Sequence, residues 1–208
     1  MVKSKERDLR LRAALVALLV AGLLVSPIAA LAYDPAGACS YADRYALSPN
    51  PNYPYFEKDC TNFVSQCLHE GGGIPFDTAG TRQWYCQKVW YGWSYTQEWT
   101  VAEKFWQWLI NDNYAKSLGY WNYPQPDNNS VTAPGDIFLY NWDATTDTIF
   151  DHASINVAYG KDINSGIIGD LVDQHTSNRL QAIWHLIPYN TQHKYTTRIY
   201  AARPWPWV

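Results

Sequence analysis

The amino-acid sequence predicts an α+β fold, with N-terminal helices packed on a C-terminal antiparallel sheet. Before residue 112, apolar residues recur at helical spacing in three segments. After residue 136, short apolar segments separated by turn residues read as strands. The polar loop 124–132 separates these two kinds of segment. This order, in which helices come first and strands follow instead of alternating with them, is typical of an α+β domain.

Three helices are expected in the first half. Residues 38–47 and 101–111 each carry apolar side chains at helical spacing. The third helix, 59–69, is the best defined, because Asp59 is a good N-cap and glycines 71–73 end it. Its apolar residues form one continuous stripe, made of Cys60, Phe63, Val64, Cys67 and Leu68.

The second half predicts a series of strands. A Pro-Gly-Asp turn at 134–136 precedes the first strand, and residues 143–147 connect the first two strands. The expected strands are 137–142, 152–159, 167–175, 183–187 and 198–202. The many Trp and Tyr residues of segment 80–100 are expected in the core, with 90–99 as its most exposed part.

The first 32 residues have the character of a secretory signal peptide. A head with five basic residues precedes an apolar run over 13–32, which ends in the small-x-small pattern Ala30-Leu31-Ala32. Cleavage there leaves residues 33–208 as one domain, secreted and extracellular or associated with the cell wall. The length of the run also leaves open that it stays as a membrane anchor.

Charge and motifs exclude several classes of function. Removal of the leader changes the net charge from −3 to −6, because the leader carries five basic and two acidic residues. An acidic domain has no electrostatic footprint for nucleic acid or anionic lipid. The sequence contains no H-E-x-x-H and no G-x-S-x-G motif, so neither a metal hydrolase nor a serine hydrolase is expected. We expect no metal and no cofactor.

Cys60 is the candidate nucleophile. It lies at the first turn of the predicted helix 59–69, where free backbone N–H groups and the helix dipole favour a thiolate. Asp59 caps this helix, and Asn62 belongs to its polar surroundings. A lone cysteine is more often a small buried hydrophobic residue, and we assign that role to Cys67, which lies in the apolar middle of the helix.

Two histidines are candidates to act with Cys60. His152 begins a predicted strand after a turn, and a Cys–His pair built from one helix and one sheet is a known hydrolytic arrangement. His175 ends the predicted strand 167–175, where it could orient the His152 ring. Asp173 and Asn178 remain alternatives for this third position, and an exposed strand-end histidine is the plain alternative for His175.

Several blocks of sequence resemble the exported Gram-positive bacterial family called "putative amidase domain". The specific block is Asp-Cys-Thr-Asn-Phe-Val-Ser-Gln at 59–66, and weaker blocks are Tyr-Ala-Asp-Arg-Tyr-Ala at 41–46, Pro-Gly-Asp at 134–136, Asp-His-Ala at 151–153 and Gln-His-Thr at 174–176. The resemblance implies a papain-like fold related to CHAP and NlpC-type cell-wall hydrolases. It implies Cys60 as nucleophile, His152 as base and His175 as the best-matched third residue.

Cysteines at 39 and 86 depart from the family pattern. Cys60 and Cys67 lie about 10 Å apart along one helix, too far for a direct bond. In an exported protein, the two departures together therefore predict a disulfide between Cys39 and Cys86.

The sequence thus predicts a secreted, monomeric cysteine amidase or peptidase. Its expected partner is peptidoglycan or another extracellular amide substrate, cleaved through a thioester intermediate, with no nucleic acid and no membrane bound after the leader is removed. The alternative is a non-catalytic cell-wall or glycan-binding module that uses an aromatic groove.

Overall fold

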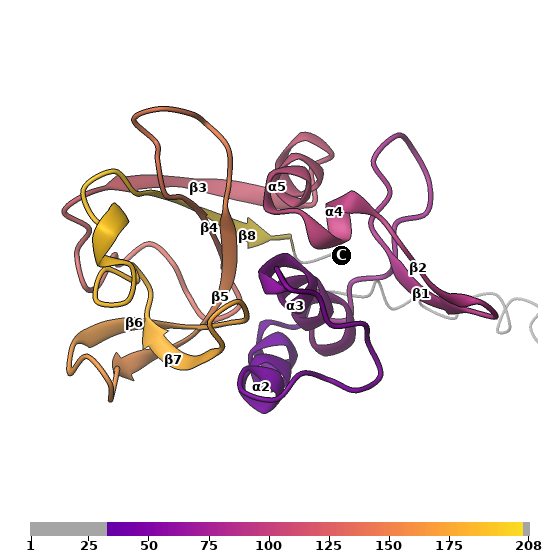
Figure 1. The fold of residues 1–208 in the computed structure, drawn as a ribbon, viewed down its shortest axis with the longest axis horizontal. Helices are drawn as coiled ribbons and strands as arrows, with labels where there is room; N and C mark the ends of the chain where they lie inside the picture. The colour runs from indigo at the N-terminus through magenta and orange to yellow at the C-terminus, as the bar shows by residue number, and fades with distance from the viewer. Residues whose placement is uncertain (1–32, 206–208) are drawn as a thin grey trace, which may run out of the picture. The chain divides into compact units, whose positions relative to one another are not determined.

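A computed structural model describes residues 33–205 and confirms the α+β class. Four α-helices from residues 35–111 lie beside an antiparallel sheet built from residues 115–204 (Figure 1). The predicted leader and its cleavage site lie outside the described residues. Within residues 33–205, no helix combines the length and the apolar character needed to cross a bilayer.

Three of the helices agree with the expected segments, with small shifts in their ends, and the short helix α4 (Gln97–Thr100) was not expected. Asp34 caps α2 (Pro35–Tyr45) by accepting hydrogen bonds from the backbone N–H groups of Ala36 and Gly37. The helix expected over 59–69 divides into α3 (Cys60–Gln66) and a π-helical turn, η1 (Cys67–Gly71). The last two helices are α4 (Gln97–Thr100) and α5 (Ala102–Asn111).

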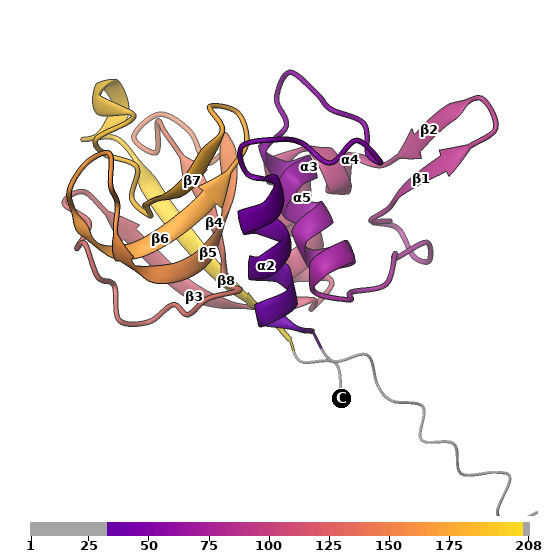
Figure 2. The same ribbon diagram turned by 90° about the horizontal axis from the view of Figure 1, so that it is seen from below.

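The six-stranded sheet has the order β3-β8-β4-β5-β6-β7, and its neighbouring strands are antiparallel. The strands are β3 (Ala115–Asn122), β4 (Ile137–Asn141), β5 (His152–Lys161), β6 (Ile168–Gln174), β7 (Arg179–Ile183) and β8 (Arg198–Pro204). A separate hairpin, β1 (Cys86–Val89) and β2 (Gly92–Tyr95), extends away from the helices (Figure 2). A short 3-10 turn, η2 (Thr191–His193), precedes β8.

Four strands were not anticipated correctly: three were missed and one was misplaced. β1, β2 and β3 lie in segments for which the sequence shows no clear alternation, and β7 lies before the predicted 183–187. Most side chains of β3 and β2 are half-buried or exposed, so neither strand carries the apolar run on which a sequence-based prediction depends.

The central strands position the core on both faces of the sheet. Ile137 and Leu139 of β4 join the cluster shared with the helices, whereas Phe138 and Tyr140 join a second cluster with Trp184 on the other face. This alternation follows from the period of two along a strand. Because every residue of β4 is buried, the sheet gives a rigid base for the residues at the start of β5.

A close glycine contact brings α2 against the end of the cysteine helix. A Cβ atom on Gly37 would lie 2.2 Å from the carbonyl oxygen of Gly71, and one on Gly71 would lie 2.6 Å from that of Gly37. Only glycine permits this approach of two backbones. The contact orients the helical segment that begins at Cys60.

The predicted disulfide between Cys39 and Cys86 is wrong, because all four cysteines are free thiols. Cys39 lies on α2 with its Sγ 3.5 Å from the carbonyl oxygen of Asn156 in β5. Cys86 begins β1, which leaves the helical layer on the side away from the sheet (Figure 2). That both cysteines depart from the family pattern says nothing about the distance between them. In the fold, Cys39 lies on α2 and Cys86 lies at the start of the separate hairpin.

Candidate active site

Cys60 is the first residue of α3 and is only 5% exposed. Its Sγ lies 3.8 Å from the Thr61 hydroxyl oxygen. Among the described residues, no protein group accepts a hydrogen bond from the backbone N–H of Cys60 or Thr61. The thiol therefore lies beside donors that remain available to a ligand.

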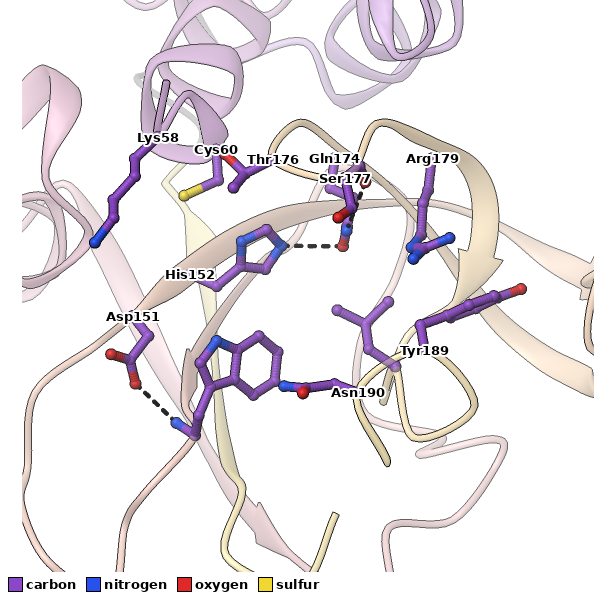
Figure 3. A pocket seen from close by; sticks show the side chains of 12 residues that line it. Lys58, Cys60, Asp151, His152, Gln174, Thr176, Ser177, Arg179, Tyr189 and Asn190 are labelled. Atoms are coloured by element: carbon purple, nitrogen blue, oxygen red, sulfur yellow. Dashed lines mark hydrogen bonds between the residues drawn. The ribbon is translucent and has the colours of Figure 1, made fainter. Parts of the chain in front are cut away.

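His152 faces Cys60 from the start of β5. Its Nε2 lies 3.0 Å from Oε1 of Gln174, which leaves Nδ1 on the side of the sulfur (Figure 3). The ring stacks on Trp142, with centroids 5.7 Å apart, and is itself 5% exposed. Because the Gln174 oxygen can only accept, it selects the tautomer or charge state that carries a proton on Nε2.

Each member of the pair shifts the ionisation of the other. Burial opposes ionisation of Cys60, but the charge of His152 and a hydrogen bond with it lower the pKa of the thiol to about 7. Burial lowers the pKa of His152, whereas the neighbouring Cys60 and the bond to Gln174 raise it above its usual value. The two groups therefore favour a thiolate–imidazolium pair near neutral pH.

The other three cysteines lack such a partner. Burial raises the pKa of Cys39 to about 11 and that of Cys86 to about 12, and it raises the pKa of Cys67 well above its usual value. The pKa of Cys60 is thus lowered, whereas burial raises the pKa of the other three thiols.

His175 makes no hydrogen bond or ring contact with His152; its partners are Asp59, Tyr45 and Phe63. Its Nδ1 is 2.5 Å from Oδ2 of Asp59, and its Nε2 is 2.9 Å from the carbonyl oxygen of Tyr45. Its ring stacks on Phe63, and both members of the His175–Asp59 pair are almost fully buried. The pair joins the end of β6 to the residue that precedes Cys60, so it positions the site.

Asp59 has more bonds than a simple N-cap. Its Oδ1 accepts hydrogen bonds from the Phe56 backbone N–H and from the side-chain amide of Asn62, and it makes no side-chain bond to the N–H groups of α3. Asn62 also binds the Pro54 carbonyl oxygen and accepts from the Trp99 indole N–H at 2.7 Å. These bonds hold the loop before Cys60 in one conformation.

The other two candidates for the third position point elsewhere. Asp173 precedes Gln174 in β6 and therefore faces the opposite side, where its Oδ1 accepts from the Gln181 backbone N–H at 2.6 Å. Burial raises the pKa of Asp173 to about 7. Asn178 lies between β6 and β7 and lines neither of the cavities described below. The structure places Gln174 beside His152 instead.

A strained turn carries Gln174 to this position. Thr176 and Ser177 both have positive φ angles, 59° and 63°, in the short connection between β6 and β7. Such a pair matches the mirror-image turn of tight hairpins, which is uncommon for a β-branched residue. The Thr176 hydroxyl accepts from the Asp59 backbone N–H at 2.8 Å, and the Gln174 amide donates to the Ser177 carbonyl oxygen. The first of these bonds holds the turn against the loop that precedes Cys60, and the second stabilises the turn itself.

Two cavities meet at Cys60. The first, about 360 Å³, we call the polar cavity; it is lined by Lys58, Cys60, Trp142, Asp151, His152, Gln174, Thr176, Ser177, Arg179, Leu186, Tyr189 and Asn190 (Figure 3). The second, about 510 Å³, we call the apolar cavity; it is lined by Phe56, Lys58, Cys60, Thr61, Tyr95, Thr100, Val101, Ala102, Ile149, Phe150 and Asp151. A ligand that spans both would pass the three residues that the cavities share, which are Lys58, Cys60 and Asp151.

Sequence reasoning missed Gln174, Lys58 and Arg179. Gln174 is the residue before His175 in the resembling block Gln-His-Thr, so the signal was present but was assigned to its neighbour. The strand period decides between them, because adjacent residues face opposite sides. No sequence signal indicates Arg179, since its place in the cavity depends on the turn at 176–177.

The candidate hydrolytic site lies at the junction of a helix and an antiparallel sheet of this α+β protein. It consists of a buried thiol, an imidazole and a side-chain amide. The chain matches the family model described as "Putative amidase domain" over residues 32–198, and it belongs to this family.

Two curated relatives come from Bacillus subtilis strain 168. One, "Uncharacterized protein YhbB", is 35% identical over 136 residues, which is 64% of this chain and 39% of the relative. The other, "Uncharacterized protein YjcM", is 32% identical over 121 residues, which is 58% of this chain and 25% of the relative. The matches thus span well under half the length of either relative. No solved structure matches the chain significantly.

Proposed function

We propose that the protein is a cysteine hydrolase that cleaves C–N amide bonds, with Cys60 as nucleophile and His152 as acid–base. The observation that carries this proposal is the buried Cys60–His152 pair at the place where two cavities meet. Membership of the amidase domain family supports the type of bond. Gln174 takes the orienting role that the sequence assigned to His175, because it bonds to the far side of the imidazole.

The geometry supports a two-step mechanism. The Cys60 thiolate attacks the amide carbon, a C–S bond forms, and the carbonyl electron pair moves to oxygen. The Cys60 backbone N–H and the Lys58 ammonium, which lines both cavities, are the donors available to this oxyanion. His152 protonates the leaving nitrogen as the C–N bond breaks, and it then activates water to hydrolyse the thioester.

Asp59 and His175 act in this proposal as positioning residues. Their buried pair ties the loop before the nucleophile to the strand that carries Gln174. Asn62 supports the same loop. A shift of about 1 Å in this region would separate the sulfur from the imidazole, and such shifts are costly to catalysis.

We propose peptidoglycan or a related extracellular amide as the substrate class. The family and the predicted leader support this assignment, which is an analogy at the level of the fold. Because the predicted mature chain is acidic, binding to an anionic wall polymer would depend on local shape and hydrogen bonds.

Turnover on purified cell walls and on a panel of peptide amides tests the proposal. We expect product from the wild type and from Cys86→Ala, a matched loss of a buried thiol away from both cavities, and none from Cys60→Ala. Rapid quenching should trap a covalent acyl adduct on the Cys60 peptide, identified by mass. Undiminished turnover by Cys60→Ala would refute the mechanism.

A second candidate function is glycan binding without catalysis. The observation that favours it is the tip of the β1–β2 hairpin, where Trp90 is 94% and Tyr91 is 70% exposed. Aromatic faces of this kind stack on sugar rings. If no substrate is turned over, while wall binding persists in Cys60→Ala and is lost in Trp90→Ala, the binding function is correct.

A further inference from the structure

We infer that the polar cavity recognises a carboxylate on the leaving-amine side of the substrate, and that Arg179 is the residue that binds it. This inference rests on the proposed function, because it names the substrate class of the same site. It predicts that the amine product is an amino acid or short peptide with a free carboxyl group.

Arg179 is a pre-positioned cation inside the polar cavity. It is the first residue of β7, directly across from Gln174 in the strand register. Its guanidinium lies 4.0 Å from the ring centroid of Tyr189 and is directed into the cavity (Figure 3). The Tyr189 hydroxyl donates to Asp162, which fixes the ring as a platform.

The guanidinium has no counter-ion within residues 33–205. The Arg179 side chain makes no salt bridge or hydrogen bond with a described residue, although the residue is half-buried. The carboxylate of Asp162 is instead occupied by Tyr189 and by the Ile183 backbone N–H. An arginine held on an aromatic ring with its donors unused is suited to a planar anion.

The neighbouring groups add donors and no negative charge. The side chains of Asn190 and Ser177 line the same cavity, and neither forms a hydrogen bond with another described residue. The acidic residue of the cavity is Asp151, whose carboxylate accepts from the Trp142 backbone N–H and lies on the side of Lys58 (Figure 3). The end formed by Arg179 is therefore positive and rich in donors.

The position of His152 assigns this end to the leaving amine. As general acid, the imidazole must reach the nitrogen that departs. His152 lines the polar cavity and not the apolar one, so the departing group lies in the polar cavity. The acyl group then occupies the apolar cavity, against side chains such as Phe56, Val101 and Phe150.

Two alkylating reagents of similar size test the carboxylate site without any turnover. Iodoacetate carries the carboxylate that iodoacetamide lacks, and both react with the Cys60 thiolate. At one pH the ratio of their rates is independent of the thiolate fraction, so a change in the pKa of Cys60 does not affect it. N-acetylcysteine gives the reference ratio.

We expect the iodoacetate-to-iodoacetamide ratio at Cys60 to exceed that of N-acetylcysteine by about tenfold or more, as one charge-assisted hydrogen-bonded contact would give. Arg179→Gln should return the ratio to the reference value. Arg198→Gln is the matched control, because Arg198 also lies over a tyrosine ring, that of Tyr120 at 4.8 Å, but lines neither cavity. It should keep the wild-type ratio.

The outcomes separate this inference from the proposed function. A wild-type ratio equal to the reference, or a high ratio that survives Arg179→Gln, overturns the carboxylate site. An iodoacetamide profile for Cys60 with the midpoint of an ordinary thiol instead counts against the hydrolase proposal, whatever the ratio. Unreacted Cys67 in every sample shows that the variants remain folded.

A substrate pair supplies the second readout. An N-acyl amino acid and its C-terminal amide differ only in the carboxylate. The wild type should hydrolyse the free acid at least tenfold more efficiently in kcat/KM, and Arg179→Gln should remove this preference mainly through KM. Equal efficiency of the two substrates in the wild type would overturn the inference.

Discussion

Replacement of His152 by alanine should deactivate the Cys60 thiol without unfolding the protein. In the wild type, the pKa of Cys60 is lowered to about 7 although the side chain is buried. Among the effects that lower the pKa, the charge of His152 and the hydrogen bond with it are the two largest. Without His152, burial should return the pKa of Cys60 to 9.0 or above. Such a rise corresponds to a loss of about 3 kcal/mol of thiolate stabilisation.

The expected change in reactivity follows from this shift. At pH 6, the thiolate fraction falls from about one in ten to about one in a thousand when the pKa rises from about 7 to 9.0. The thiolate of higher pKa is intrinsically about eightfold more nucleophilic. The net rate of alkylation at pH 6 should therefore fall about tenfold, and the midpoint of the pH profile should move up by two units or more.

Time courses of iodoacetamide labelling from pH 5 to pH 10, with each cysteine peptide quantified by mass spectrometry, measure this effect. The other three thiols are internal controls, since the pKa of each is raised by burial and unfolding would label all of them. His193→Asn is a matched histidine replacement, as His193 contacts Asp143 and lines neither cavity. An unchanged midpoint in folded His152→Ala would refute the assignment of the pair.

Three further predictions concern the groups around this pair. Gln174→Leu should reduce kcat/KM by about five- to tenfold, the effect of one lost hydrogen bond. It should also move the upper limb of the pH–activity profile to lower pH, because Gln174 raises the pKa of His152. An upper limb at unchanged pH would exclude an orienting role. Asp59→Asn should reduce the free energy of unfolding in urea by about 3 kcal/mol, since it breaks a buried pair with His175; lost activity at full stability would instead indicate a catalytic role. The free energy of unfolding should fall by up to about 4 kcal/mol as the pH rises from about 4 to about 7, and it should then level off. The reason is that burial raises the pKa of Asp173 to about 7, so over this range the folded state holds a proton that the unfolded state has lost. Asp173→Asn should remove this slope, and a stability that rises over the same range would contradict the assignment.

The sequence predicted the elements that depend on local pattern. The stripe from Cys60 to Leu68 predicted the helix, and the apolar runs after residue 136 predicted β4, β5, β6 and β8 within a few residues. The three strands that it missed, β1, β2 and β3, are stabilised by pairing with other strands rather than by an apolar run of their own. Pairing between distant segments leaves no local signal.

The sequence by itself determined that Cys60 begins a buried helix and that His152 begins a strand, because a cap, a stripe and a turn are local features. Only the tertiary structure decided that Gln174 lies beside His152 while His175 binds Asp59, since this choice depends on strand direction and on a turn with two positive φ angles. It also decided that Cys39 and Cys86 stay apart and that Arg179 enters the polar cavity. Which face a side chain presents, and what it meets there, is set by packing between segments far apart in the chain.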